Sequence, residues 1–186
     1  MLDAPRWGVW RAMTRDGRLT KVPYSAVTGK MARSNVIEDW TSFEAAQAFK
    51  DESPLNQGLG FCLGDGWAGV DLDGCFDSDT GTVAPEAEAI IESFETYTEV
   101  SPSGTGFKLF MHGSLAEGTK GARIKAPWTK PGDVHGDIEV YSAGRYFTVT
   151  GEDWGGYPIQ ERDTALQELQ QRYFLRGAPN TTGAHP

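Results

Sequence analysis

The sequence predicts a mixed α+β domain rather than a helical bundle or a β-sandwich. Short runs rich in β-branched and aromatic residues recur along the chain and are separated by glycine-containing turns. Between them lie segments whose apolar residues repeat at helical spacing. The chain has 186 residues, of which 39% are hydrophobic, and this is enough for one compact core. The mixture of the two periods is typical of α+β folds.

Six segments have the composition and length of β-strands. They are residues 8–14, 59–63, 68–73, 107–112, 137–141 and 146–150. In the fourth of these, Phe107, Leu109 and Met111 point to one side, while Lys108 points to the other, because side chains alternate along a strand. The last two segments flank a Ser-Ala-Gly turn and therefore predict a hairpin.

Three segments predict helices. The first begins after Thr41 or Ser42, either of which can cap it, and places Phe43, Ala46 and Phe49 on one face. The second runs from about residue 85 to 94 and has proline in its first turn. The third covers about residues 161–175.

The end of the chain has a different composition from the rest. Residues 176–186 are rich in Gly, Pro, Asn and Thr and contain little that could be buried. We therefore expect one domain over residues 1–175 and a flexible linker or tail over residues 176–186.

The charge distribution is uneven. Seventeen basic residues against 26 acidic ones give a net charge of −9, which excludes a general electrostatic attraction to nucleic acid or to an anionic membrane. Residues 51–100, however, hold 12 acidic residues and no basic one. Such a concentration is expected where carboxylates gather around cations, although a solvated acidic surface would have the same composition.

The cysteine count and the hydropathy pattern indicate the compartment. Two cysteines are too few for a zinc site without histidine ligands at a suitable spacing. The N-terminus has no apolar run of signal-peptide length, and no stretch approaches the roughly 20 apolar residues of a membrane span. We therefore expect a reduced, cytoplasmic protein with no membrane partner.

The first candidate for chemistry is Asp71-Leu72-Asp73. The two carboxylates share one face of a predicted strand, so their Cβ atoms lie roughly 6 to 7 Å apart. Because they would otherwise repel each other, a divalent cation is a natural counter-charge. Asp-x-Asp is also common by chance, and the spacing of a calcium-binding loop is absent here.

The second candidate is a turn of small residues from Ser101 to Gly106, followed by Lys108. Its glycines allow the backbone to approach a ligand closely, and its hydroxyl and amide groups can bind phosphate. The spacing of a Walker loop is absent. The alternative is an ordinary hairpin turn.

The third candidate is the segment from Asp137 to Gly151, in which Glu139 points away from the inward-facing Ile138 and Val140. Arg145 follows the turn, and its guanidinium suits phosphate geometry. A simple surface ion pair between Glu139 and Arg145, worth about 0 to 1 kcal/mol, is the alternative interpretation.

In their order along the chain, these segments resemble the motifs of the archaeo-eukaryotic primase superfamily, in particular the compact primase-polymerase domains of phages, plasmids and other mobile elements. That family has an Asp-x-Asp strand, then a Ser-Gly-x-Gly-x-His strand, then a Glu-x-Tyr strand followed by Gly-Arg-Tyr-Phe-Thr-x-Thr-Gly. The third motif is the most specific match, and the resemblance extends over about residues 6–151. One departure is that Lys108 stands where the family usually has histidine.

The resemblance implies an RRM-like antiparallel sheet as the catalytic core, with helices on one face, joined to a small N-terminal α/β module. It also implies template-directed nucleotidyl transfer, in which a DNA primase/polymerase makes or extends primers on single-stranded DNA for the replication of a mobile element. Two Mg²⁺ or Mn²⁺ ions would activate the attacking hydroxyl and stabilise the leaving pyrophosphate. Their ligands would be Asp71, Asp73 and Glu139.

The resemblance assigns the remaining roles to basic and small residues. The nucleoside triphosphate would be held by Ser101, Ser103, Gly104, Gly106, Lys108, Arg145 and Lys21, with Lys108 also a catalytic residue. The template would contact Lys30, Arg33, Lys120, Arg123, Lys125 and Lys130, and Trp128 would be available for base stacking. We expect residues 118–132 to form an irregular loop, either a DNA-binding loop or an ordinary solvated one.

Two rival functions remain open at this point. The lysine at position 108 suggests a nucleotide- or metal-binding module with impaired catalysis, because an ammonium cannot act near neutral pH as an imidazole does. A metal-dependent nuclease would use the same three carboxylates without a triphosphate site. Because an acidic domain binds DNA weakly by itself, the linker-like tail also leads us to expect a helicase or other domain in the same polypeptide.

Overall fold

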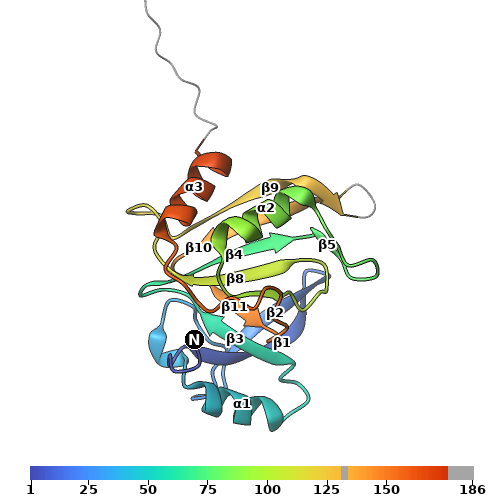
Figure 1. Ribbon diagram of the computed structural model, residues 1–186. Coiled ribbons are helices and arrows are strands. Elements are labelled where there is room, and N and C mark those ends of the chain that lie inside the picture. The colour runs from blue at the N-terminus through green and yellow to red at the C-terminus, as the bar shows by residue number, and fades with distance from the viewer. Residues whose placement is uncertain (131–133, 176–186) are drawn as a thin grey trace, which may run out of the picture.

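The computed structural model describes residues 1–130 and 134–175 and has a mixed α+β fold (Figure 1). All strand pairs are antiparallel and form two larger sheets and one small one. Sheet A has the order β11–β3–β1–β2, sheet B the order β7–β8–β4–β10–β9, and β5 pairs with β6. The predicted α+β class is confirmed. The predicted tail, residues 176–186, lies outside the described residues.

The strand boundaries are as follows. Sheet A contains β1 (Trp7–Arg15), β2 (Arg18–Tyr24), β3 (Gly58–Cys62) and β11 (Tyr146–Val149). Sheet B contains β4 (Trp67–Asp73), β7 (Thr98–Val100), β8 (Phe107–His112), β9 (Gly121–Lys130) and β10 (Val134–Tyr141). The small sheet pairs β5 (Phe76–Asp77) with β6 (Thr82–Val83).

The three predicted helices are confirmed. They are α1 (Phe43–Asp51), α2 (Pro85–Phe94) and α3 (Asp163–Tyr173), and a 3-10 turn, η1 (Ile37–Asp39), precedes α1. Ser42 caps α1 by accepting a hydrogen bond from the Ala45 amide. Helices α2 and α3 lie together beside sheet B, whereas α1 lies at the opposite end of the molecule, beyond sheet A (Figure 1). None of the helices in the described part of the chain has the length and apolar content needed to span a bilayer.

The main core lies between sheet B and the helices α2 and α3. The strands contribute side chains that alternate toward the helices, and the helices contribute their apolar stripes. The core includes Val70, Leu72, Phe107, Leu109, Met111, Ile90, Phe94 and Leu166, all almost completely buried. Burial of each large apolar side chain is worth about 1.5–3 kcal/mol. Side chains alternate along a strand, so the remaining side chains of these strands point to the opposite face of sheet B.

A second core joins the two sheets. Phe147 of β11 packs against Phe110 of β8, and the packing continues to Phe61 of β3. A Cβ atom added to Gly69 would lie 2.5 Å from the ring of Phe147. The absence of a side chain at Gly69 therefore lets the edge of sheet A lie against the polar face of sheet B.

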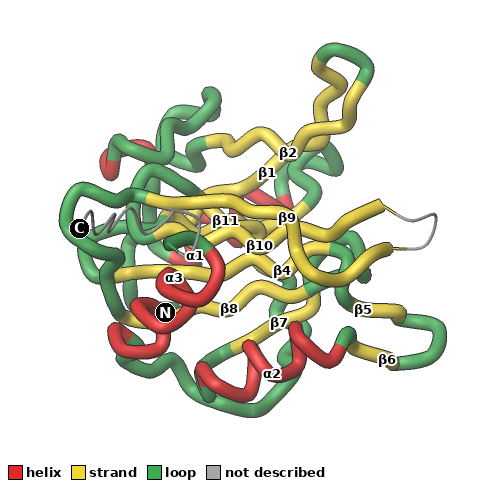
Figure 2. Tube along the Cα trace, turned by 90° about the horizontal axis from the view of Figure 1, so that it is seen from above, coloured by secondary structure: helices red, strands yellow, loops and turns green. Residues whose placement is uncertain are grey.

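Five strands, β2, β5, β6, β7 and β9, were not among the six predicted ones. Strand β2 forms a hairpin with β1, and in Figure 2 this hairpin projects beyond the body of the domain. Its turn, Asp16-Gly17, has φ angles of 50° and 73°. Asp-Gly is the preferred sequence for a two-residue hairpin turn of this kind, so the sequence does contain the signal.

The prediction of an irregular loop over residues 118–132 is wrong, because residues 121–130 form β9 at the edge of sheet B. Alternate residues from Ala122 to Trp128 pack into the main core. Pro127 is tolerated because an edge strand leaves backbone positions without a ladder partner. Trp128 is 5% exposed, and its Nε1 donates to the Asp73 carbonyl at 2.9 Å. It is therefore not available for base stacking.

The predicted hairpin over residues 137–150 is also wrong. Strand β10 pairs with β4 and β9 in sheet B, while β11 pairs with β3 in sheet A. The turn between them is held by the carbonyl of Lys120, which accepts from the amides of Ser142 and Ala143 at 3.0 and 3.3 Å. The chain thus crosses from one sheet to the other between Glu139 and Arg145.

Candidate active site

One register row of sheet B carries a charged residue on every strand. Glu99 of β7 lies opposite Lys108 of β8, and Lys108 lies opposite Asp71 of β4. Asp71 lies opposite Glu139 of β10, which in turn lies opposite Arg123 of β9. Directly opposed side chains have Cβ atoms about 4.5–5.5 Å apart. The row therefore brings the predicted residues Asp71, Lys108 and Glu139 together, from three separate segments.

Four of the five charged residues in this row form ion pairs with one another. Lys108 Nζ forms a hydrogen-bonded ion pair with Asp71 Oδ2. Glu139 Oε2 accepts from Arg145 at 3.1 Å and from the Tyr141 hydroxyl at 2.9 Å, and its Oε1 lies 3.4 Å from Arg123 Nε. Through its contact with Glu139, Arg145 of the segment between the two sheets lies beside the row.

A second row, one position further along the face, contains two more carboxylates. Asp73 lies opposite Asp137, and Asp137 lies opposite Lys125. Asp137 is paired with Arg123 at 2.6 Å and with Lys125 at 3.0 Å. Burial alone would raise the pKa of Asp137, but these two cationic partners outweigh burial and lower it. The sequence interpretation missed Asp137, although it stands two residues before Glu139 and therefore on the same strand face.

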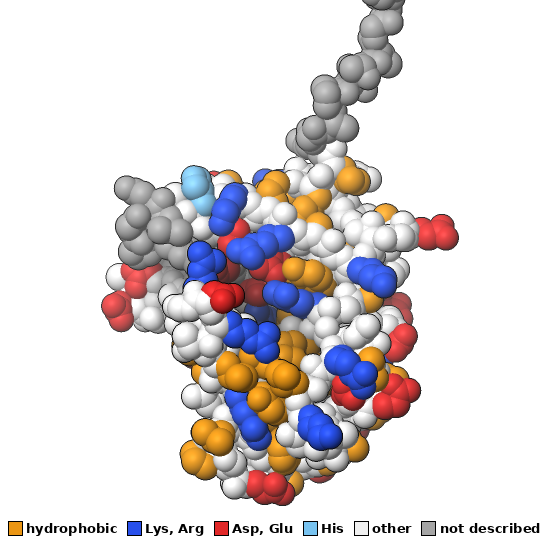
Figure 3. All heavy atoms as spheres, turned by 180° about the vertical axis from the view of Figure 1, so that it is seen from behind, with side chains coloured by type: hydrophobic (Ala, Val, Ile, Leu, Met, Phe, Trp, Pro, Cys, Tyr) orange, Lys and Arg blue, Asp and Glu red, His pale blue; other side chains and the backbone are white. Residues whose placement is uncertain are grey.

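Lys21 lies on β2, in sheet A. Its pKa is lowered by partial burial and by the charge of Lys108, while Asp71 and Asp73 act in the opposite direction. The Lys21 carbonyl accepts from the Tyr146 hydroxyl at 2.7 Å, which ties β2 to β11. Figure 3 shows acidic side chains recessed in a hollow and ringed by Lys and Arg side chains.

The turn from Ser101 to Gly106 connects β7 to β8 as a hairpin and lies beside Asp73. A Cβ atom added to Gly106 would overlap the Leu72 carbonyl oxygen and lie 3.1 Å from Asp73 Cα. Glycine at this position therefore allows close contact with β4. The Ser103 hydroxyl lies 2.9 Å from those of both Ser101 and Thr105, and Gly104 has a φ of 70° that favours glycine. A chain of hydroxyl groups thus lines the turn.

A scan against family models finds no match for the chain. A sequence search finds a DNA primase-polymerase of Nitratiruptor phage NrS-1 that is 34% identical over 164 residues. The aligned residues make up 87% of this chain but 21% of the phage protein, so the chain spans about a fifth of that protein's length. The chain therefore belongs to the family of primase-polymerase domains.

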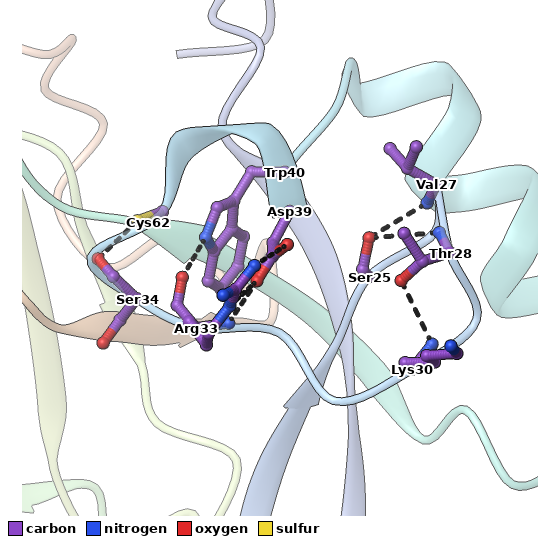
Figure 4. Close-up of polar contacts among 9 residues, drawn as sticks. All are labelled: Ser25, Val27, Thr28, Lys30, Arg33, Ser34, Asp39, Trp40 and Cys62. Atoms are coloured by element: carbon purple, nitrogen blue, oxygen red, sulfur yellow. Dashed lines mark hydrogen bonds and ion pairs between the residues drawn. The ribbon is translucent and has the colours of Figure 1, made fainter.

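The basic residues expected to contact DNA occupy three different environments in the primase-polymerase domain. Lys30 and Lys120 are exposed. Arg33 is held by Asp39 through two hydrogen bonds, from Nε at 2.9 Å and from NH2 at 3.1 Å (Figure 4). Arg123 and Lys125 belong to the carboxylate rows. Strand β9 ends at Lys130, whose side chain lies outside the described part of the structure.

The carboxylates of the primase-polymerase domain have the right chemistry for a hard divalent cation, because Asp71, Asp73, Asp137 and Glu139 offer only oxygen ligands on two adjacent strands. Within residues 1–130 and 134–175, however, no three acidic, histidine or cysteine side chains converge as a ready-made metal site. Asp71, Asp137 and Glu139 each pair with basic side chains. Metal binding in the primase-polymerase domain would therefore require these ion pairs to exchange.

Glu99, at the end of the first row, is a buried residue that the sequence interpretation missed. It is completely buried and accepts from the Thr150 amide at 2.9 Å, the Gly151 amide at 3.1 Å and the Tyr97 hydroxyl at 2.9 Å. Burial raises its pKa despite these donors. Glu99 thus connects the strand pair that carries Lys108 with the Thr-Gly end of the third motif.

We expect Glu99→Ala to lower the free energy of unfolding by about 3 kcal/mol, because it leaves three buried donors without an acceptor at about 1–3 kcal/mol each. Glu99→Gln keeps the shape and one acceptor oxygen, and its loss should be about half as large. Urea denaturation of both variants measures the effect. The exposed Glu86→Ala in α2 serves as the control. Equal stability of Glu99→Ala and Glu86→Ala would show that the Glu99 contacts contribute nothing.

Proposed function

We propose that this domain catalyses template-directed nucleotidyl transfer, as a DNA primase/polymerase that makes or extends primers on single-stranded DNA in the replication of a phage or another mobile element. The observation that carries the proposal is the charged row on sheet B. It aligns Asp71 and Glu139 side by side and flanks them with Lys108 and Arg145. A carboxylate pair beside two cations is what a reaction between a metal-bound triphosphate and a hydroxyl group requires.

Asp71, Asp73 and Glu139 are the proposed ligands of two Mg²⁺ or Mn²⁺ ions. When bound, such ions lower the pKa of the attacking hydroxyl and neutralise the leaving pyrophosphate. Asp137 is kept ionised by Arg123 and Lys125. It lies opposite Asp73 and adds to the negative potential that would attract divalent cations.

Lys108, Arg145 and Lys21 are the proposed triphosphate ligands, together with Ser101, Ser103, Gly104 and Gly106 of the hydroxyl-lined turn. With no metal bound, Lys108 and Arg145 balance Asp71 and Glu139. Once those carboxylates bind cations, the ammonium and guanidinium groups lose their partners and become available to phosphate oxygens. The same side chains thereby stabilise the domain without nucleotide and hold the nucleotide when it binds.

The wider context of the proposal follows from the relative. The phage DNA primase-polymerase is several times longer than this chain. This length agrees with a catalytic domain that works beside a helicase or another domain of one polypeptide. We further propose that sheet B with α2 and α3 is the RRM-like core, and that sheet A with α1 is the N-terminal module.

A second candidate function is a nucleotide-binding module with impaired catalysis. The observation that favours it is the ion pair between Lys108 and Asp71, because Asp71 is a proposed metal ligand. Lys108 also stands where the primase-polymerase domains usually have histidine. In this case the domain binds nucleoside triphosphate but transfers its nucleotidyl group, with release of pyrophosphate, only slowly.

A synthesis assay tests the proposal. Purified domain is given single-stranded DNA with and without a primer, ribo- or deoxyribonucleotides, and Mg²⁺ or Mn²⁺. Products in any of these reactions support nucleotidyl transfer, and the unprimed reactions report on priming. If no product forms while triphosphate still binds, the module with impaired catalysis is the better description, and Lys108→His should then restore synthesis. If neither binding nor synthesis is detected, both functions are excluded.

A further inference from the structure

The β1–β2 hairpin differs in charge from the rest of the chain. Residues 7–24 contain four basic side chains and one acidic one, within a chain of net charge −9. The hairpin projects from the body of the domain (Figure 2). A projecting basic element on an acidic protein concentrates positive potential at one place.

Arg15 and Arg18 lie directly opposite each other on either side of the hairpin turn. Like charges at directly opposed positions destabilise a strand pair. Within the described part of the chain, neither arginine forms an ion pair, and the contact of Arg15 is a hydrogen bond at 3.5 Å to the sulfur of Met31. The repulsion between the two arginines therefore destabilises the hairpin, and no ion pair in the described structure offsets it. Unfavourable local interactions of this kind are expected at functional positions.

The segment after β2 contacts the hairpin. Met31 bridges to Tyr24 of β2, and its sulfur contacts Arg15. The turn before Met31 is held by hydroxyl groups, since Ser25 Oγ accepts from Val27 and Thr28, and Thr28 Oγ1 accepts from the Lys30 amide at 3.3 Å (Figure 4). We call Arg15 and Arg18 the basic tip. Both are exposed.

Most other basic residues are already engaged. Arg6, Arg33, Lys50, Lys108, Arg123, Lys125, Arg145 and Arg162 each pair with a carboxylate. Two exposed apolar side chains flank the basic tip, since Leu19 is 76% and Met31 55% exposed. Strand β2 is tied to β11 at the Lys21 carbonyl, and the hairpin extends from there to its turn. Arg15 and Arg18 lie on the face of the hairpin opposite to Lys21 and Leu19.

We propose that the basic tip binds the phosphate backbone of the single-stranded DNA that leads into the active site, with the exposed apolar side chains lying against sugars and bases. This inference rests on the proposed function. Phosphates supply the counter-charge that Arg15 and Arg18 lack, and guanidinium groups bind phosphate oxygens in pairs. DNA binding by the domain then depends on this hairpin, although the net charge of the domain is negative.

The test is the salt dependence of DNA binding. Fluorescence anisotropy with a labelled single-stranded oligonucleotide is measured over a range of NaCl concentrations for wild type, Arg15→Gln/Arg18→Gln and the control Lys50→Gln/Arg172→Gln. The control removes the same charge from α1 and α3. Loss of two phosphate contacts should make the plot of log affinity against log salt less steep by about 1.4 and weaken binding, while the control should change neither. Arg15→Lys/Arg18→Lys should keep most of the slope.

Three further results complete the test. The Gln variant should melt at the same temperature as wild type or slightly above it, because an unfavourable charge pair is removed, and this excludes misfolding as the cause of weaker binding. A slope unchanged by the Gln substitutions, or changed equally by the control, would overturn the inference.

Triphosphate binding by the wild type reports on the proposed function separately. If triphosphate binds and primers are extended while the Gln variant keeps the wild-type slope, only the inference about the basic tip is wrong.

Discussion

Replacing Asp71 and Asp73 together by asparagine should reduce template-directed synthesis by about 10³-fold or more, while the domain remains folded. Asparagine keeps the shape of each side chain, and the amide that replaces the Asp71 carboxylate still offers an oxygen to Lys108, so the strand pairs of sheet B should be retained. What is lost is the negative charge that attracts divalent cations, and ligation of a catalytic metal is worth several kcal/mol of transition-state stabilisation. Single-turnover extension of a labelled primer measures the rate.

The matched control for this experiment is Glu86→Gln/Glu88→Gln. It changes the net charge by the same two units in the first turn of α2, where both side chains are exposed. We expect the control to extend primers at nearly the wild-type rate. Should the Asp71/Asp73 variant remain as active as this control, these carboxylates are not metal ligands, and the proposed mechanism fails.

The sequence predicted the elements of the main core well, because local periodicity determines them. The alternation in residues 107–112 and the helical stripes of α2 and α3 depend only on neighbours in sequence, and the structure confirms each. The same regularity was present in β9, where residues from Ala122 to Trp128 alternate between core and surface. The Gly, Lys and Pro content of this segment favours a loop, whereas the alternation favours a strand, and the structure follows the alternation.

What the sequence could not show is register. The rows Glu99–Lys108–Asp71–Glu139–Arg123 and Asp73–Asp137–Lys125 depend on which residues of five strands lie opposite one another. No local pattern specifies this, because register is set by long-range pairing. The sequence therefore offers Arg123 and Lys125 as candidates for DNA contact without indicating that both pair with carboxylates, as the structure shows. The role of Glu99 could not be predicted for the same reason, since the amides of Thr150 and Gly151 that it binds lie about 50 residues away in sequence.

Lys108 is the residue on which the two candidate functions divide. It is 8% exposed and lies between two carboxylates, with Asp71 as its ion-pair partner and Glu99 opposite it on β7. Its ammonium also lies 4.7 Å from the centre of the Phe147 ring, where sheet A meets sheet B. The lysine thus balances two negative charges and contacts the junction of the sheets, and both candidate functions use its charge to hold triphosphate.

We therefore expect Lys108→Met to weaken triphosphate binding by about 10- to 100-fold, since a charged hydrogen bond contributes about 1.5–3 kcal/mol. The variant should also lose about 2 kcal/mol of stability. Methionine fills the same space against Phe147 but leaves Asp71 and Glu99 without their counter-charge. Calorimetric titration with a non-hydrolysable triphosphate measures the binding, and urea denaturation measures the stability.

Lys125→Met is the control, because Lys125 also pairs with a sheet B carboxylate but its side chain is 66% exposed. Its pair should therefore contribute at most about 1 kcal/mol. If Lys108→Met binds triphosphate as tightly as Lys125→Met does, Lys108 is a structural counter-ion alone, and the phosphate-binding role belongs to Arg145 and the turn from Ser101 to Gly106.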